Sequence, residues 1–456
     1  LSSVLGGSGA TEYRDPARFF ANTYPTSGLK ELLASVCSRL SGKPSSAVFR
    51  LDTSYGGGKT HGLIALVHAA RGMTGVANVS EFLDPDLVPR TKVRIAAFDG
   101  EGADPANGRP MGNGLRAYTP WGEIAVQLNG AEGYSLVARS DEQHIAPGKD
   151  TFRELFGDGP LLIVLDELGE YLRRVKHMTG ARDQLAAFLK ALLSAVEETP
   201  RAAVVYTLAL RPDGESSDAF AAENQFIARA MAELESISGR KATILNPTKD
   251  DETAKVLRRR LFSEVNDSKA AAVIDAYRKL WSANADHLSD EARRPTTVEE
   301  FASTYPFHPD VLDTLLGKTA TLNGFQRVRG LLRVLGRTVA SVWANRPKDA
   351  HAIHLHHIDL GDEAIRREFT TRLQQDAFAP AIRNDIAGTR ENPALAAELD
   401  AKFYKGLLPY ATYVARAVFL HSLAFHNDLK GTTASHLRYS LLSPAADLTF
   451  IDDART

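Results

Sequence analysis

In the first half of the chain, short unbroken runs of apolar residues alternate with longer segments in which apolar residues recur with helical spacing. Such runs, bounded by polar or glycine-rich segments, are typical of strands buried on both faces of a parallel sheet. Strands that alternate with helices in this way predict an α/β fold. The runs that predict strands are 47–51, 92–100, 161–165, 201–210 and 239–247.

Beyond residue 247 the pattern becomes mainly helical, as in 325–343, where apolar residues follow helical spacing. The sequence therefore predicts four parts: an N-terminal helical segment 1–45, an α/β core 46–247, a helical region 248–346 and a mainly helical region 347–456. Within 1–45, Asp15 before Pro16 and Thr26 or Ser27 are predicted to cap two helices. These helices are expected to pack beside the core. A contact between them and the base of a bound nucleotide is an alternative.

The first candidate site follows the first predicted strand. There a glycine triplet is followed by Lys59, Thr60 and a helical pattern, and this order lets backbone N–H groups and a helix N-terminus converge on a phosphate. Lys59 is expected to reach the β- and γ-phosphates, and Thr60 to bind Mg²⁺. Thr53 stands where the P-loop pattern has its first glycine. A glycine-rich turn with a chance Lys-Thr pair does not explain the flanking strand and helix. The predicted nucleotide contacts are Ser54, Tyr55, Gly56, Gly57, Gly58, Lys59, Thr60 and His61.

The second candidate site is the acidic pair Asp166 and Glu167, which ends the third predicted strand. The first carboxylate is expected to hold Mg²⁺, and the second to deprotonate the water that attacks the γ-phosphate. The alternative is a solvated helix start with favourable charge. In the fourth strand, Thr207 is either a γ-phosphate sensor or an ordinary strand residue, and Arg211 is a further candidate near the phosphates.

Two more polar positions leave alternatives open. Asp99 ends the second predicted strand at the edge where ligands bind, although a turn before Gly100 explains it equally. The segment Gly100–Gly114 is predicted to be a long surface loop. In the helical region, Arg329 begins an arginine stripe that faces either phosphates or solvent.

The last part of the chain offers two weaker patterns. His351, His354, His356 and His357 suggest a metal site on a strand, but no Cys or helical HExxH motif accompanies them, so a structural role is favoured. The segment KGTTASHLRYSLLSP resembles the second half of a helix-turn-helix with Thr432 or Thr433 as cap, so a winged helix is a candidate for 347–456.

Composition narrows the classes of partner. The 456 residues hold 54 basic and 56 acidic side chains, so nucleic-acid contact would have to be local. The lone cysteine, Cys37, is expected in a helix core, and a reducing cytosol fits. No run reaches the roughly 18 apolar residues of a membrane helix, so a cytoplasmic location and no membrane partner are expected. The ends of the chain suggest a fragment of a larger polypeptide.

These motifs, in this order, resemble an AAA+ ATPase of the ASCE class over roughly 47–345. More narrowly, LDTSYGGGKTHGLIAL, PWGEIAVQL, LLIVLDELGEYL, FHP and RG-LLR are similar to a family of large prokaryotic ATPases, long called a domain of unknown function. That family is akin to the phage-exclusion (BREX) and phage-growth-limitation ATPases. Its form of the P-loop, TSYGGGKTH, also has threonine at the position of Thr53 in place of the first glycine.

The resemblance implies ATP and Mg²⁺ as cofactors and the roles already given to Lys59, Thr60, Asp166 and Glu167. It further implies a helical lid with Arg329 as sensor arginine, a homo-oligomer, and an arginine finger in trans, for which Arg240 or Arg229 are candidates. Implied partners are other defence proteins such as a DNA methyltransferase, with DNA as a further candidate.

Three functions compete on this basis. The leading one is an ATPase that drives conformational change or assembly in a DNA-modification and anti-phage system. The second is an oligomeric ATP-dependent switch or scaffold with little turnover that recruits a methyltransferase or effector, against which the intact Glu167 argues. The third is a DNA translocase or loader, which the loop Gly100–Gly114 supports poorly because Arg109 is its only basic residue.

Overall fold

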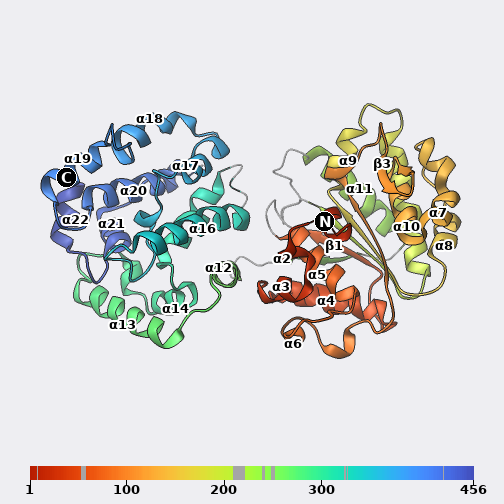
Figure 1. Ribbon diagram of the computed structural model, residues 1–456, viewed down its shortest axis with the longest axis horizontal. Helices are drawn as coiled ribbons and strands as arrows, with labels where there is room; N and C mark the ends of the chain where they lie inside the picture. The colour runs from red at the N-terminus through yellow and green to blue at the C-terminus, as the bar shows by residue number, and fades with distance from the viewer. Residues whose placement is uncertain are drawn as a thin grey trace. The chain divides into compact units, whose positions relative to one another are not determined.

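The chain folds into two compact units, Leu1–Asp250 and Asp251–Thr456 (Figure 1). The computed structural model describes residues 1–7, 9–52, 58–208, 221–238, 242–247, 252–322, 325, 327–424 and 426–456. The division near residue 250 lies close to the predicted change from strands to helices. Residues 1–45 belong to the first unit together with the α/β core, and the two predicted helical regions share the second unit.

The first unit is built on a five-stranded sheet in the order β2-β5-β6-β1-β7, with all neighbouring pairs parallel. This confirms the predicted parallel sheet. Because β1 lies between β6 and β7, later strands are added on both sides of the first one, and sheets with such a switch bind ligands outside the carboxyl ends of their strands. The strands are β1 (Val48–Asp52), β2 (Arg94–Asp99), β5 (Leu161–Asp166), β6 (Ala202–Leu208) and β7 (Thr243–Leu245).

Helices cover both faces of this sheet (Figure 1). Successive strand residues point to opposite faces, so Ile163 and Leu165 join one buried cluster with α7, α8 and α10 while Leu162 and Val164 join another with α4 and α5. The helices of this unit are α1 (Ser2–Leu5), α2 (Thr11–Arg14), α3 (Pro16–Ala21), α4 (Ser27–Leu40), α5 (Lys59–Ala70), α6 (Val79–Phe82), α7 (Pro120–Glu142), α8 (Lys149–Phe156), α9 (Leu168–Arg174), α10 (Ala181–Glu198) and α11 (Ala221–Ser238).

The segment predicted as one long surface loop contains regular structure. It begins with a 3-10 turn, η2 (Gly100–Gly102), and continues into a hairpin of β3 (Arg109–Gly112) and β4 (Leu115–Ala117). The hairpin could not be predicted from the sequence because its strands are short. In addition, Gly112 and Gly114 at its tip have positive φ angles that strand residues rarely adopt.

The N-terminal helices pack against the core as expected, and their predicted caps are confirmed. Asp15 accepts hydrogen bonds from the first backbone amides of α3, and Thr26 accepts one from Leu29 N in α4. The Thr26 hydroxyl also donates to the Pro247 carbonyl oxygen at 2.5 Å. A Cβ on Gly28 would lie 1.8 Å from the Asn246 carbonyl oxygen, so only glycine fits where α4 meets the end of β7.

Cys37 lies in the buried face of α4 with no exposed surface. Burial raises the pKa of its thiol to about 12, so the thiolate fraction at pH 8 is roughly 10³-fold lower than for a free cysteine. We expect a thiol reagent to label the native protein at least about 10³-fold more slowly than the unfolded chain. Stopped-flow labelling with and without denaturant measures this ratio, and comparable rates would contradict the burial of α4.

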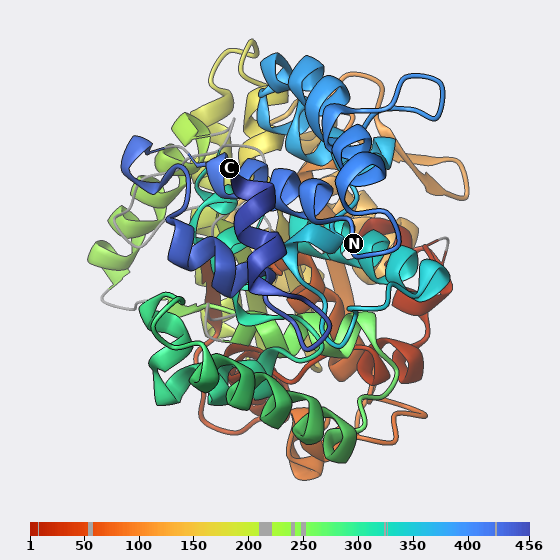
Figure 2. The ribbon, with the colours of Figure 1, turned by 90° about the vertical axis from the view of Figure 1, so that its left-hand side faces the viewer.

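The regular secondary structure among the described residues of the second unit is helical (Figure 2), apart from an isolated bridge between Phe307 and Ile353. The segment KGTTASHLRYSLLSP forms a helix, α21, capped by Thr433. No strand pair follows it within 426–456, so the described residues contain no wing, and the winged helix stays a prediction. The helices are α12 (Thr253–Leu261), α13 (Asp267–Ala283), α14 (Pro295–Thr304), α15 (Pro309–Gly317), α16 (Arg327–Asn345), α17 (Glu363–Phe369), α18 (Ala379–Ala381), α19 (Leu395–Phe403), α20 (Tyr410–Ser422), α21 (Ala434–Leu441) and α22 (Leu448–Arg455).

Among the described residues, none of the helices combines the length and apolar character that crossing a bilayer requires.

Candidate active site

The carboxyl ends of β5, β6 and β1 lie side by side because these strands are neighbours in the parallel sheet. Ligands of open α/β sheets bind outside this edge. Here β5 ends at Asp166, β6 carries Thr207 before its last residue, and α5 begins beyond β1. The structure therefore brings together predicted residues from three distant parts of the sequence.

The carboxylate of Asp166 is the centre of this site. Its Oδ1 accepts a hydrogen bond from the Thr207 hydroxyl at 2.6 Å, and its Oδ2 accepts one from the Thr60 hydroxyl at 3.1 Å. Only 3% of Asp166 is exposed. Burial raises the pKa of its carboxyl above the usual value, although the two hydroxyls and the Lys59 charge oppose that shift.

Thr60 and Asp166 fit the predicted Mg²⁺ site. Carboxylate and hydroxyl oxygens are the hard ligands that Mg²⁺ prefers. A buried carboxylate is costly in its charged form, and a divalent cation beside it would supply the compensating charge. Burial raises the pKa of Asp166, and a cation bound beside this carboxylate would oppose that shift.

Glu167 follows Asp166 directly and leaves the strand at a sharp turn. Its φ angle of 53° lies in the left-handed region, which non-glycine residues adopt rarely and often at functional sites. Burial raises the pKa of Glu167 to about 7, and the charges of Asp166, Glu170 and Asp99 add to the shift. A carboxyl with a pKa near neutrality is suited to general acid–base catalysis.

The Thr207 hydroxyl connects these two acids. It donates to Asp166 Oδ1 and accepts the Glu167 backbone N–H at 3.3 Å. Both roles of the hydroxyl are therefore used within the site. Thr207 is buried, and a buried hydroxyl needs such partners in either role, so its task as a γ-phosphate sensor stays a prediction.

The start of α5 supplies the predicted phosphate contacts that the structure describes. Gly58 precedes the helix with a φ angle of 83°, and Lys59 and Thr60 are its first two residues. Their backbone amides lie at a helix N-terminus, which favours anions. The predicted contacts Ser54, Tyr55, Gly56 and Gly57 lie outside the described residues, as do Arg211 and Arg240.

His61 lies against the N-terminal helices. Its Nε2 donates to the Thr23 hydroxyl at 2.9 Å, because that hydroxyl already donates to the Phe19 carbonyl oxygen at 2.7 Å. Its ring stacks on Phe19 with ring centroids 4.5 Å apart. His61 thus joins α5 to α3, and its predicted contact with a nucleotide stays a prediction.

The candidate arginines lie in different units. Arg229 is exposed on α11 in the first unit, and Arg329 is exposed on α16 in the second. Further along α16, Arg333 pairs with Glu368 at 2.9 Å, so this part of the predicted stripe has a structural role. Phosphate contact by Arg329 stays a prediction.

Gly100 is a site residue that sequence reasoning missed. A Cβ on Gly100 would lie 2.0 Å from the Glu167 carbonyl oxygen, so the turn after β2 touches the backbone of the predicted base. Arg174, at the end of α9, donates to the Glu101 carbonyl oxygen at 2.7 Å and holds the same turn. The only signal in the sequence was the glycine after Asp99, which also suits an ordinary turn.

Glu123, at the start of α7, is a buried acidic residue and the second residue near the site that the sequence analysis missed. It is 2% exposed and pairs with Arg109 of β3 at 3.1 Å. Burial raises the pKa of Glu123 to about 7, although Arg109 opposes the shift. This ion pair joins β3 of the hairpin to α7, the helix that follows β4.

The histidines suggested as a metal site do not lie on a strand. His356 and His357 belong to a 3-10 turn, η6 (Leu355–His357), and their Nε2 atoms lie 2.9 and 3.4 Å from Asp349 Oδ2. The His354 backbone N–H donates to His357 Nδ1 at 2.9 Å. His357 must therefore carry its proton on Nε2, which favours the structural role over metal ligation.

The first unit is thus an α/β protein whose parallel sheet carries hydroxyl and carboxylate groups at its carboxyl edge. Residues 1–241 match the model of the DUF499 N-terminal domain, and residues 248–436 match that of the DUF499 second domain. The chain belongs to the DUF499 family. No curated protein and no solved structure matched it.

Proposed function

We propose that the first unit binds ATP with Mg²⁺ and hydrolyses it. The observation that carries this proposal is the hydrogen-bonded set of Thr60, Asp166, Thr207 and Glu167 at the carboxyl edge of the sheet. A P-loop nucleotidase needs a hydroxyl and a carboxylate for Mg²⁺ beside a residue that positions or deprotonates the attacking water. These groups come from three segments, so chance motif matches do not explain their meeting.

Each residue has a defined task in this proposal. Lys59 and the first amides of α5 would bind the phosphates, while Thr60 and Asp166 would hold Mg²⁺. Bound there, Mg²⁺ would neutralise charge on the phosphate oxygens. Glu167 would orient the attacking water and accept its proton. Thr207 would fix the position of Asp166 relative to Glu167 through its two hydrogen bonds.

We also propose that this unit is an AAA+ ATPase that acts as a homo-oligomer in a DNA-modification and anti-phage defence system. Support for the AAA+ class comes from the motif order and from β6 lying between the P-loop strand and the acidic strand. Support for the defence role, and for a methyltransferase or DNA as partner, comes from sequence resemblance alone. The scaffold with little turnover is the alternative outcome of the experiment.

The experiment compares ATP binding and steady-state hydrolysis by wild type and Lys59→Ala, with and without duplex DNA. Loss of the lysine removes charge-assisted hydrogen bonds to phosphate, so affinity should fall by about 100-fold. Lys190→Ala on the exposed side of α10 is the matched control and should behave as wild type.

Each result has a clear meaning. Turnover that Lys59→Ala removes and Lys190→Ala keeps supports the ATPase, and a rise with DNA favours a motor on DNA. Tight ATP binding without turnover under either condition favours the scaffold. No ATP binding by wild type would refute both functions.

A further inference from the structure

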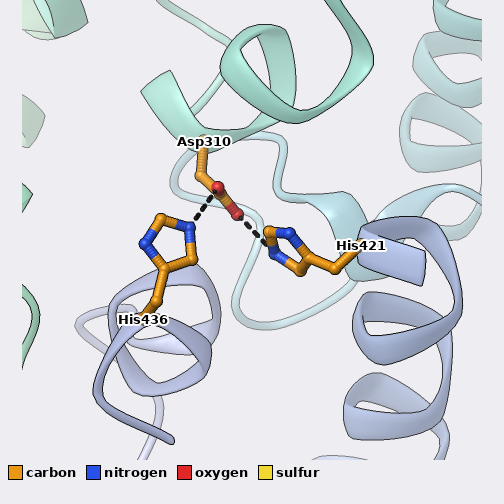
Figure 3. Close-up of side chains that lie close together, drawn as sticks. All are labelled: Asp310, His421 and His436. Carbon is orange, nitrogen blue, oxygen red and sulfur yellow. Dashed lines mark hydrogen bonds and ion pairs between the residues drawn. The ribbon is translucent and has the colours of Figure 1, made fainter. Parts of the chain in front are cut away.

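Three side chains with metal-binding atoms meet in the second unit, far from the proposed ATPase residues in sequence (Figure 3). Asp310 comes from α15, His421 from the last turn of α20 and His436 from α21. Asp310 Oδ1 lies 2.8 Å from His436 Nε2, and Asp310 Oδ2 lies 3.4 Å from His421 Nε2. The carboxylate thus lies between the two imidazole rings.

Two of the facing atoms lack a hydrogen-bond partner among the described residues. Asp310 Oδ2 and His421 Nε2 are both buried and unsatisfied, although they face each other. Asp310 is 1% exposed and His421 has no exposed surface. At 3.4 Å the two atoms form a long ion pair rather than a hydrogen bond, and an ion bound between them would be a partner for both.

Oxygen atoms that can accept a proton lie near the outer nitrogens of both rings, and Lys318 Nζ is a competing donor at His421 Nδ1. His436 Nδ1 lies 3.5 Å from Glu291 Oε2 and 3.5 Å from the Ser289 hydroxyl. His421 Nδ1 lies 3.3 Å from the Thr314 hydroxyl. Metal-bound histidines usually donate their other N–H to such a carboxylate or oxygen, which fixes the ring and its tautomer.

Thr314 completes this arrangement. Its hydroxyl donates to Asp310 Oδ1 at 3.1 Å, so it is free to accept the proton of His421 Nδ1. One hydroxyl therefore orients both a carboxylate and an imidazole toward the same point. When Nδ1 donates to Thr314, His421 Nε2 keeps its lone pair for a cation; when Nδ1 instead accepts from Lys318, Nε2 carries the proton and faces Asp310.

We propose that Asp310, His421 and His436 bind a divalent transition-metal ion, with Zn²⁺ as the best fit to two imidazoles and one carboxylate. The ligand atoms all lie within 4.8 Å of one another. A tetrahedral Zn²⁺ with bonds of about 2.0–2.2 Å holds its ligands roughly 3.3 Å apart, so the side chains need only small shifts. Three protein ligands leave a fourth position for water or another ligand.

Access and charge agree with this site. The His436 side chain is 23% exposed, so an ion can approach from its side. The acidic residues Glu291 and Asp313 lie near His436, and their negative charges favour a bound cation. The positive charge of Lys318 on the His421 side opposes cation binding. Lys318 Nζ lies 3.2 Å from His421 Nδ1, where it competes with Thr314, but it also donates to the Gly431 carbonyl oxygen at 2.7 Å.

The cluster of Asp349, His356 and His357 provides an internal contrast. It has the same residue types, but His357 Nδ1 accepts a backbone N–H, so its Nε2 carries a proton and cannot bind a metal without breaking that bond. The Tyr413 hydroxyl also donates to Asp349 Oδ1 at 3.0 Å. The two clusters differ in the groups that face the histidine Nδ1 atoms: a backbone N–H faces His357 Nδ1, whereas the Thr314 hydroxyl and Lys318 Nζ both face His421 Nδ1.

The test is Zn²⁺ titration of the metal-free full chain by calorimetry at neutral pH without nucleotide, followed by visible absorption of the Co²⁺ form. Wild type should bind one Zn²⁺ that Asp310→Asn, His421→Gln and His436→Gln each weaken by about 100-fold or more. His351→Gln, an exposed histidine of the same unit, is the control and should bind as wild type. Circular dichroism checks that each variant is folded.

Lys318→Met gives the test a second direction. Removing the competing donor should tighten Zn²⁺ binding several-fold, which simple loss of structure cannot do. Because His436 is partly exposed, His436→Gln carries the test if Asp310→Asn fails to fold. Absence of stoichiometric Zn²⁺ binding by wild type, or equal binding by wild type and His436→Gln, would overturn the proposal and leave an ion pair of Asp310 and His436.

Discussion

Glu167→Gln is expected to lower ATP turnover by about 10²–10⁴-fold, the usual contribution of a general base. Glutamine keeps the size and the backbone hydrogen bond to Thr207, but it cannot accept the proton of the attacking water. Lys59, Thr60 and Asp166 are unchanged, so ATP affinity should stay within a few-fold of wild type. Single-turnover hydrolysis and equilibrium binding of labelled ATP measure the two quantities separately.

Glu170→Gln is the matched control for this change. Glu170 lies one turn further along α9 and pairs with Arg174 at 2.7 Å, away from the strand end. The substitution removes one of the smaller contributions to the raised pKa of Glu167, so turnover should stay within a few-fold of the wild-type rate. Equal losses in both variants would mean that negative charge near α9 matters in general and that Glu167 is not the base.

Gly100→Ala is expected to reduce turnover by about 10²-fold, because a displacement of about 1 Å at a reacting group has effects of this size. The new Cβ would lie 2.0 Å from the Glu167 carbonyl oxygen, and ordinary contacts begin at 3.4 Å. Either the turn after β2 or the Glu167 backbone must move, and overpacking of this kind also costs about 1–3 kcal/mol of stability. Turnover and urea unfolding of the same preparation measure both effects.

Gly102→Ala separates this contact from a general effect on the turn. Its Cβ would meet the Arg109 guanidinium at 3.4 Å, which is an ordinary contact with a flexible side chain. We expect turnover and stability close to wild type. If Gly100→Ala also leaves turnover unchanged, the contact between Gly100 and Glu167 does not position the acid.

The sequence indicated the sheet because its signals are local. Each core strand is an unbroken apolar run. A strand that is buried on both faces can be predicted from such a run alone, without knowing which strands pair with it. The predicted strand at 161–165 became β5 (Leu161–Asp166), and the run at 201–210 became β6 (Ala202–Leu208). Helix caps such as Asp15 and Thr26 were predictable for the same reason, since the cap and the amides it binds are neighbours in sequence.

Other features failed to appear in the sequence because their residues become neighbours only through packing. The β3–β4 hairpin has short strands and a glycine-rich tip, so it looked like a loop. The histidines at 354–357 alternate as in a strand but form a 3-10 turn around a buried carboxylate. Periodicity over so few residues does not decide between these conformations.

By itself, the sequence determined the parallel sheet, the helices that flank it and the identity of the polar residues at its strand ends, because spacing and residue type along the chain carry that information. Only the tertiary structure decided that Thr207 bridges Asp166 and Glu167, that Gly100 touches Glu167, and that Asp310 meets His421 and His436. These contacts join segments far apart in the chain, and which side chains meet there depends on how strands and helices pack rather than on any local pattern.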